Sequence, residues 1–220
     1  MQFPNAHSGV KKIFTAEILS LIGVVLFIAA AIAAFGVASI AEAAKAETDV
    51  GEAAGLAVFV LFGLAAAILS LIGFILNLIG ISSAMKDEPT FKTAMTFALI
   101  GIGLSAVSGI FSGSETVNSF VQILVKLAEL FVSLYVVQGI MKLAEKLNNS
   151  DMVARGSKCR WWLVITFCIP ALIKLVSAVF TLTEAEGAAD ILSLVAAVLA
   201  VIAYFIYLSY LSKAKKMLAA

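Results

Sequence analysis

The chain has 220 residues, of which 62% are hydrophobic and only 13% are charged, and its formal net charge is +1. Soluble domains carry roughly a quarter charged residues, and a chain of this length has too little interior to hide so much apolar surface from water. The composition therefore predicts an integral membrane protein with the lipid bilayer as its first partner. The near-neutral charge argues against a nucleic-acid partner.

Six apolar stretches predict six transmembrane helices, each long enough for a hydrocarbon core of about 30 Å. They fall near residues 15–40, 56–84, 92–112, 118–141, 161–182 and 190–211. We expect an all-α fold in which residues 1–220 form a single transmembrane bundle. The first stretch follows Lys11 and Lys12 and continues to about Ile40 without a convincing cleavage site. We therefore interpret it as a retained span rather than a signal peptide.

The distribution of charge predicts that both termini are cytoplasmic. Twelve of the fifteen basic residues fall in the segments that this topology places inside, whereas Lys45 falls outside and Lys126 and Lys174 lie within spans. Eight of the fourteen acidic residues fall in the outer loops. Trp161 and Trp162 stand where an interfacial aromatic anchor is expected. Because inner loops carry the excess of Lys and Arg, we expect N-in, C-in topology in a bacterial-type inner or plasma membrane.

Short strings recur at the ends of the spans and favour a helical hairpin repeated three times. ILSLIG occurs at 18–23 and 68–73, ILSLV occurs at 191–195, and the looser ILVKL occurs at 123–127. Triplication of a hairpin would produce such a pattern. The alternative, chance recurrence of common membrane residues, stays open.

Small and polar residues recur at steps of three and four along the second and third spans. The row in these spans includes Gly63, Ser70, Gly73, Asn77, Gly80, Gly101, Ser105 and Ser108. Small residues let helix backbones approach one another in lipid. We interpret the row as a helix-packing seam in which Asn77 forms an interhelical hydrogen bond. A polar channel lined by the serines and Asn77 is the alternative.

The fourth span carries Lys126 and Glu129 inside its apolar run. Gln122 and Ser133 extend the same helix face by one turn in each direction. Charges at membrane depth are costly, so they are expected to face protein or water rather than lipid. This span therefore needs neighbours that cover its polar face.

The fifth span contains two features that bear on those charges. Pro170 lacks a backbone donor and predicts a helix kink, and Lys174 follows one turn later. Because the fourth and fifth spans are joined by an inner loop, Lys174 is expected to meet Glu129. The cluster of Lys126, Glu129 and Lys174 is either a paired lock that fixes helix register or an outward-facing site for an anionic solute.

The sequence lacks the motifs that membrane catalysis would need. It contains no HExxH, no GxSxG, no paired aspartates and no Gly-rich phosphate loop with a lysine. His7 is the single histidine, and two cysteines, Cys159 and Cys168, do not make a metal-binding pattern. We therefore expect no metal, no cofactor and no enzymatic activity.

Two functions are compatible with these residues. The first is a polytopic membrane protein that acts through helix packing with itself, as a homo-oligomer, or with a membrane-protein partner. The second is a small-solute transporter, or the substrate-binding component of one, that uses Lys126, Glu129 and Lys174. In size alone the chain resembles the substrate-binding components of energy-coupling-factor vitamin transporters, so no residue role is carried across from them.

Overall fold

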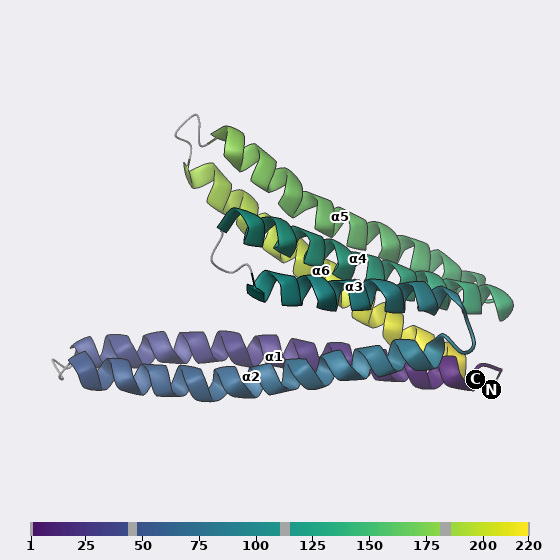
Figure 1. The fold of residues 1–220 in the computed structure, drawn as a ribbon, viewed down its shortest axis with the longest axis horizontal. Coiled ribbons are helices and arrows are strands. Elements are labelled where there is room, and N and C mark those ends of the chain that lie inside the picture. The colour runs from purple at the N-terminus through teal and green to yellow at the C-terminus, as the bar shows by residue number, and fades with distance from the viewer. Residues whose placement is uncertain (1, 44–47, 111–114, 181–185, 220) are drawn as a thin grey trace. The chain divides into compact units, whose positions relative to one another are not determined.

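The computed structural model describes residues 2–43, 48–110, 115–180 and 186–219. Within these ranges, side chains are described except at 37–43, 48–54, 115–116, 119, 169–180, 186–194 and 196. The described backbone forms helices only, which confirms the predicted all-α fold (Figure 1). In chain order the helices are α1 (Pro4–Ala43), α2 (Thr48–Ala84), α3 (Thr90–Ile110), α4 (Glu115–Lys146), α5 (Ser150–Phe180) and α6 (Glu186–Ala219).

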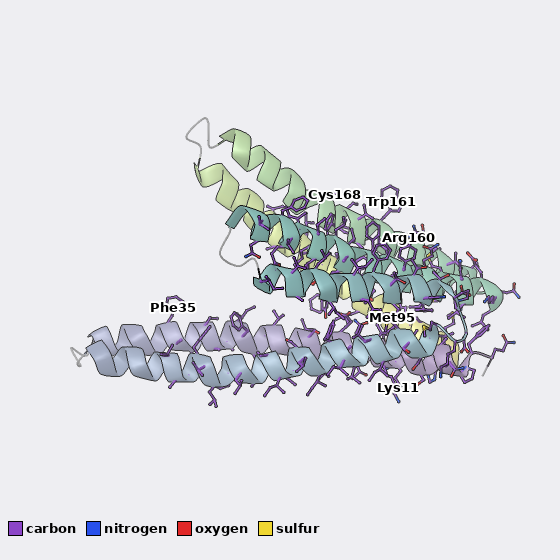
Figure 2. The ribbon with its side chains drawn as sticks, viewed as in Figure 1. Lys11, Phe35, Met95, Arg160, Trp161 and Cys168 are labelled. Carbon is purple, nitrogen blue, oxygen red and sulfur yellow. The ribbon has the colours of Figure 1, made fainter. Side chains whose placement is uncertain are left out.

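Five described segments are long and apolar enough to cross a membrane. They are Pro4–Gly36, Gly55–Ala84, Thr90–Ile110, Phe120–Lys146 and Ala197–Ala219. Large apolar side chains on these helices point outward, as Phe35 does on α1 with 79% of its surface exposed (Figure 2). Lipid is the solvent that such a surface requires. The remaining predicted span, 161–182, runs into residues whose side chains lie outside the described ones, so a sixth crossing stays a prediction.

The helices extend beyond the predicted spans, most clearly at the turn between α4 and α5. The amide N–H groups of Asn148 and Asn149 donate to the carbonyls of Glu145 and Ala144 at 3.0 and 2.9 Å, and Asn148 has a φ of 53°. This is the paired hydrogen-bond pattern of a Schellman cap, in which asparagine tolerates the left-handed conformation. Asn149 Oδ1 then accepts from the amide of Met152 at 3.1 Å and caps α5. The turn is tight because Asn148 and Asn149 together cap the end of α4 and the start of α5.

The chain groups into two compact units, and each is described by itself. Unit 2 is Lys12–Ile79 and consists of most of α1 with most of α2. A Cβ atom at Gly73 would lie 3.0 Å from the carbonyl oxygen of Ala16, and one at Gly23 would lie 3.1 Å from Ser70 Oγ. Glycine at these positions therefore allows the two backbones to approach closely. The single bundle expected over residues 1–220 stays a prediction.

Unit 1 is Met1–Lys11 together with Gly80–Ala220. In it α3 packs on α4, α4 on α5, and α5 on α6. Its fully buried side chains lie in the N-terminal segment, around the α2–α3 turn, in α5 and in the C-terminal halves of α4 and α6; they include Val10, Ile81, Phe91, Val136, Val137, Ile140, Leu143, Cys159 and Leu211. A Cβ atom at Gly139 would lie 2.6 Å from Cε2 of the buried Phe91 ring. Gly139 therefore makes the space in α4 that Phe91 fills.

This contact predicts that Gly139→Ala destabilises the protein. The Phe91 ring is fully enclosed, so it cannot give way without displacing its neighbours, and overpacking of this kind costs roughly 1–3 kcal/mol. Thermal unfolding in mild detergent should show a lower Tm. The control is Gly103→Ala in α3, where no described atom apart from the adjacent backbone of α3 lies within 4 Å of the new Cβ and the loss of glycine should stabilise by up to about 1 kcal/mol. Equal Tm changes for the two variants would contradict the packing described.

Candidate functional site

The intramembrane charges of α4 form an ion pair on an exposed face. Lys126 Nζ donates to Glu129 Oε2 at 2.7 Å, and the two side chains are 66% and 58% exposed. Among the described residues, neither side chain forms another ion pair. Ser133, one turn further, donates its hydroxyl to the backbone carbonyl of Glu129 at 3.2 Å. The pair thus lies at the surface of the described fold, on a helix apolar enough to cross a membrane.

The buried face of α4 explains why this pair is exposed. Val121, Val125 and Ala128 are all more than nine-tenths buried, and Ala128 contacts the position of Gly101 on α3. Lys126 and Glu129 each follow one of these buried residues, so they lie about 100° further around the helix. The charged stripe therefore flanks the contact between α3 and α4 instead of entering it.

The partner predicted for this pair, Lys174, falls in α5 but its side chain lies outside the described ones, as does that of Pro170. The structure packs α4 against α5, which is the neighbour relation that a contact between Lys174 and Glu129 requires. The contact itself, and the kink at Pro170, stay predictions.

Gln122 joins a different polar cluster from the one in which the sequence grouped it. Its Nε2 donates to Ser108 Oγ at 2.8 Å, and the Ser108 hydroxyl donates to Asn118 Oδ1. Ser108 is only 7% exposed. Hydrogen bonds between helices satisfy polar groups where lipid offers no partner. Gln122 and Asn118 therefore connect α4 to α3, and Asn118 is a member that the predicted seam did not include.

The remaining seam residues divide into close contacts and open positions. Gly80 lies against the start of α1, because its carbonyl oxygen would be 2.5 Å from a Cβ at Gly9, and Gly101 faces α4 as described above. By contrast, no described atom apart from the adjacent backbone of α2 lies within 4 Å of a Cβ at Gly63. Ser105 is exposed, and its hydroxyl donates to the backbone carbonyl of Gly101 at 2.9 Å. Periodic small residues thus mark both packed and lipid-facing positions on these helices.

Asn77 forms a contact with an acid that was not among the predicted site residues. Its Nδ2 donates to Glu17 Oε1 at 3.4 Å, which links α2 to α1 within unit 2. Asn77 Oδ1 is buried and has no hydrogen-bond partner among the described atoms. The signal that would have found Glu17 is a single carboxylate inside the first apolar run, since ionisable residues within spans mark functional or structural contacts.

The acidic pair Asp87–Glu88, in the turn before α3, forms hydrogen bonds with residues of α1, α3 and α4. Asp87 accepts from the amide of Ala6 at 2.7 Å and from Asn5 Nδ2 at 2.8 Å. It thus caps the amino end of α1, where a negative charge also meets the positive end of the helix dipole. The signal in the sequence was two adjacent acids in an otherwise basic inner segment.

Glu88 caps α3 and pairs with α4. Its Oε1 accepts from the Thr90 hydroxyl at 2.8 Å and from the Thr90 amide at 3.3 Å, and its Oε2 accepts from Lys146 Nζ at 2.6 Å. Lys142 Nζ lies 4.0 Å from Glu88 Oε1. Burial raises the pKa of the Glu88 carboxyl, but the hydrogen bonds from Lys146 and Thr90 outweigh burial and hold the pKa below its ordinary value of 4.5. Glu88 is therefore a charged, satisfied group at the end of the bundle.

Five membrane-length apolar helices and polar side chains paired from one helix to the next define a multi-pass helical membrane protein. Comparison of the chain with protein-family models, with curated proteins and with solved structures finds no match. Its function is therefore argued from its own residues.

We expect Glu88→Gln to destabilise the protein by about 1–2 kcal/mol at pH 7, because a hydrogen bond to a charged group is worth roughly 1.5–3 kcal/mol and the half-exposed Lys146 regains part of that from water. Unfolding in detergent with denaturant or heat would measure the difference. The control is Glu145→Gln. Glu145 is an exposed residue of α4 next to Lys146, and its substitution should change stability by less than about 0.5 kcal/mol.

The same variant predicts a pH dependence. Because the pKa of Glu88 is lowered in the folded state, its contribution is present above pH 4.5 and is lost as the pH falls through the folded-state pKa. The difference in stability between the native protein and Glu88→Gln should therefore shrink on acidification from pH 7 to below pH 4. A difference that stays constant over this range would contradict an ionised Glu88.

Proposed function

We propose that this chain is a six-span, non-catalytic membrane protein that acts by packing against a second copy of itself or against a membrane-protein partner. The observation that carries the proposal is the exposed Lys126–Glu129 ion pair on α4. A charge at the centre of a membrane helix costs about 2.5–3.5 kcal/mol on insertion scales, and pairing offsets only part of that cost. A protein surface that covers the pair and completes its hydrogen bonds would offset the rest.

The hydrogen bonds that the described acidic side chains already form support a non-catalytic role. Asp87 and Glu88 cap helices, and Asp151 accepts from Arg155 Nε at 2.7 Å one turn away on α5. Each of these carboxylates already has a structural partner. A general acid or base needs access to a substrate proton.

A small-solute transporter, or the substrate-binding component of one, is the alternative. It would use the same exposed pair with Lys174 as an outward-facing anion site. The two readings differ in what covers the pair: a polypeptide in the first and a hydrated solute in the second.

We further propose an inner- or plasma-membrane location with both termini cytoplasmic. The ends of the chain lie at the same end of unit 1 (Figure 1), and the basic residues Lys142, Lys146, Arg155 and Lys213 belong to the helix ends found there. The positive-inside rule makes such an end cytoplasmic. An origin in three repeated hairpins is part of the same proposal, and it rests on the recurrence of ILSLIG and ILSLV in the sequence.

Site-specific photo-crosslinking tests the proposed assembly. A photoreactive phenylalanine analogue at Ile123, one turn from Lys126 and 50% exposed, should crosslink in native membranes to a second copy or to one stoichiometric partner. The control position is Val198 on α6, which is 53% exposed and should give mainly lipid adducts. Glu129→Gln should lower the yield at Ile123 at least thirtyfold, since breaking a covered charge pair costs roughly 2–5 kcal/mol.

The same substitution should change the Tm of the isolated chain little, because an exposed pair contributes at most about 1 kcal/mol to folding. Crosslinks that form only within the chain or to lipid would contradict the assembly. Native mass spectrometry that shows a bound anionic solute and no second polypeptide would favour the transporter instead.

A reporter fused after Ala220 tests the orientation. Because of the charge distribution, a cytoplasm-active reporter such as green fluorescent protein should be active there, and an alkaline phosphatase fusion at the same residue should be inactive. An active phosphatase fusion would overturn the proposed topology.

A further inference from the structure

A groove of about 520 Å³ runs between α5 and α6 in unit 1. Its lining changes in character along its length, and we name its two parts by their residues. The basic end consists of Arg155 and Lys158 from α5 and Lys213 from α6. The apolar end consists of Trp162, Ile202 and Phe205. The groove is distinct from the charged stripe of α4.

The basic end carries more positive charge than the described acidic side chains neutralise. Lys158 and Lys213 are exposed and form no ion pair among them. Arg155 donates one Nε–H to Asp151 at 2.7 Å, which leaves the remaining N–H groups of its guanidinium for another acceptor. With Asp151 counted, the basic end keeps an excess of two positive charges. It is electrostatically suited to a phosphate.

A buried hydroxyl lies at the same end of the groove. Tyr210 lines it, one turn before Lys213, and only 3% of its surface is exposed. Its hydroxyl has no hydrogen-bond partner among the described atoms. The hydroxyl would lie 2.7 Å from a Cβ at Gly156 of α5, so it is packed between the two helices and is not open to a ligand in the groove.

The apolar end places the groove across the membrane interface. Trp162 lies seven residues after Arg155, about 10 Å along the helix, and tryptophan concentrates at the level of lipid headgroups. The neighbouring Arg160 and Trp161 extend outward from the same stretch of α5 (Figure 2), where Trp161 is 68% exposed. On α6, Phe205 is 54% exposed and precedes Lys213 by eight residues, about 12 Å along the helix, within the membrane-length segment Ala197–Ala219 that contains both. A ligand that fills the whole groove must be anionic at one end and apolar along the other.

We propose that the α5–α6 groove binds an anionic phospholipid, with its phosphate at the basic end and an acyl chain along the apolar end. Basic pockets between membrane helices recognise anionic headgroups by this combination of charge and depth. A free anion would use only the basic end and would leave the aromatic and aliphatic lining without a role. The inference requires only that the chain is embedded in a membrane and does not depend on the proposed assembly.

The two tryptophans of the chain provide the measurement. In a Trp161→Phe background, Trp162 is the single tryptophan and reports occupancy of the apolar end. The full-length protein is placed in nanodiscs of phosphatidylcholine that contain increasing fractions of phosphatidylglycerol with brominated acyl chains, which quench tryptophan on contact. Brominated phosphatidylcholine with the same chains serves as the reference. We expect phosphatidylglycerol to quench at a much lower mole fraction than phosphatidylcholine does.

Charge variants locate the preference. Each cation near an anionic headgroup changes affinity about fivefold, so Lys158→Gln with Lys213→Gln should weaken the preference roughly 25-fold and in practice abolish it. The matched control is Lys86→Gln with Lys92→Gln, which removes two exposed lysines of unit 1 away from the groove and should shift the midpoint less than twofold. Tyr210→Phe should shift the midpoint less than twofold, because the hydroxyl is packed against α5 and is not open to the groove.

Several outcomes would overturn the proposal. Equal quenching by the two lipids would mean that Trp162 meets ordinary bulk lipid. An equal loss in both double-lysine variants would assign the preference to general surface charge. Displacement of brominated phosphatidylglycerol by millimolar inorganic phosphate would assign the basic end to a soluble anion. A normal Tm for each variant confirms that the lost preference is not a loss of fold.

Discussion

Unit 1 depends on two adjacent carboxylates in the turn between α2 and α3. Asp87 caps α1, and Glu88 caps α3 and pairs with Lys146 of α4. The dipeptide itself follows the end of α2, so four helices are joined at this turn. The fully buried Phe91 lies three residues after Glu88 and fills the space left by Gly139. Removing either carboxylate would leave helix amides or a lysine without a partner beside the close contact of Phe91 with Gly139.

Away from this junction the protein is held together by close backbone contact and sparse polar pairs. Gly73 and Gly23 bring α1 and α2 together in unit 2. Ser108 of α3 forms hydrogen bonds with two amide side chains of α4, those of Asn118 and Gln122. Such contacts suit helices in lipid, because apolar side chains there gain little by exchanging lipid for protein and association depends on packing and hydrogen bonds. The outward surface is left apolar for the bilayer.

Two polar features on that surface motivate the two proposals. The Lys126–Glu129 pair lies on a face of α4 that no described residue covers, and this motivates a protein partner. The α5–α6 groove joins a cationic end to an apolar one, and this motivates a lipid. They differ in chemistry: the pair is neutral overall and lies within the apolar run of α4, whereas the basic end of the groove carries excess positive charge.

The amino-acid sequence by itself determined the membrane class, the all-α fold and the approximate position of five apolar helices, because hydropathy and helix propensity are local properties that add along a segment. It did not determine which side chains meet. Helical spacing grouped Gln122 with Lys126, yet the Gln122 side chain donates a hydrogen bond to Ser108. Asp87 accepts a hydrogen bond from the backbone amide of Ala6, 81 residues away. Gly63 and Gly73 look alike in the sequence, but only Gly73 contacts another helix. The physical reason is that helices apolar on nearly every face carry no stripe that specifies their rotation, so tertiary packing alone selected the contacts and assembled the groove from α5 and α6.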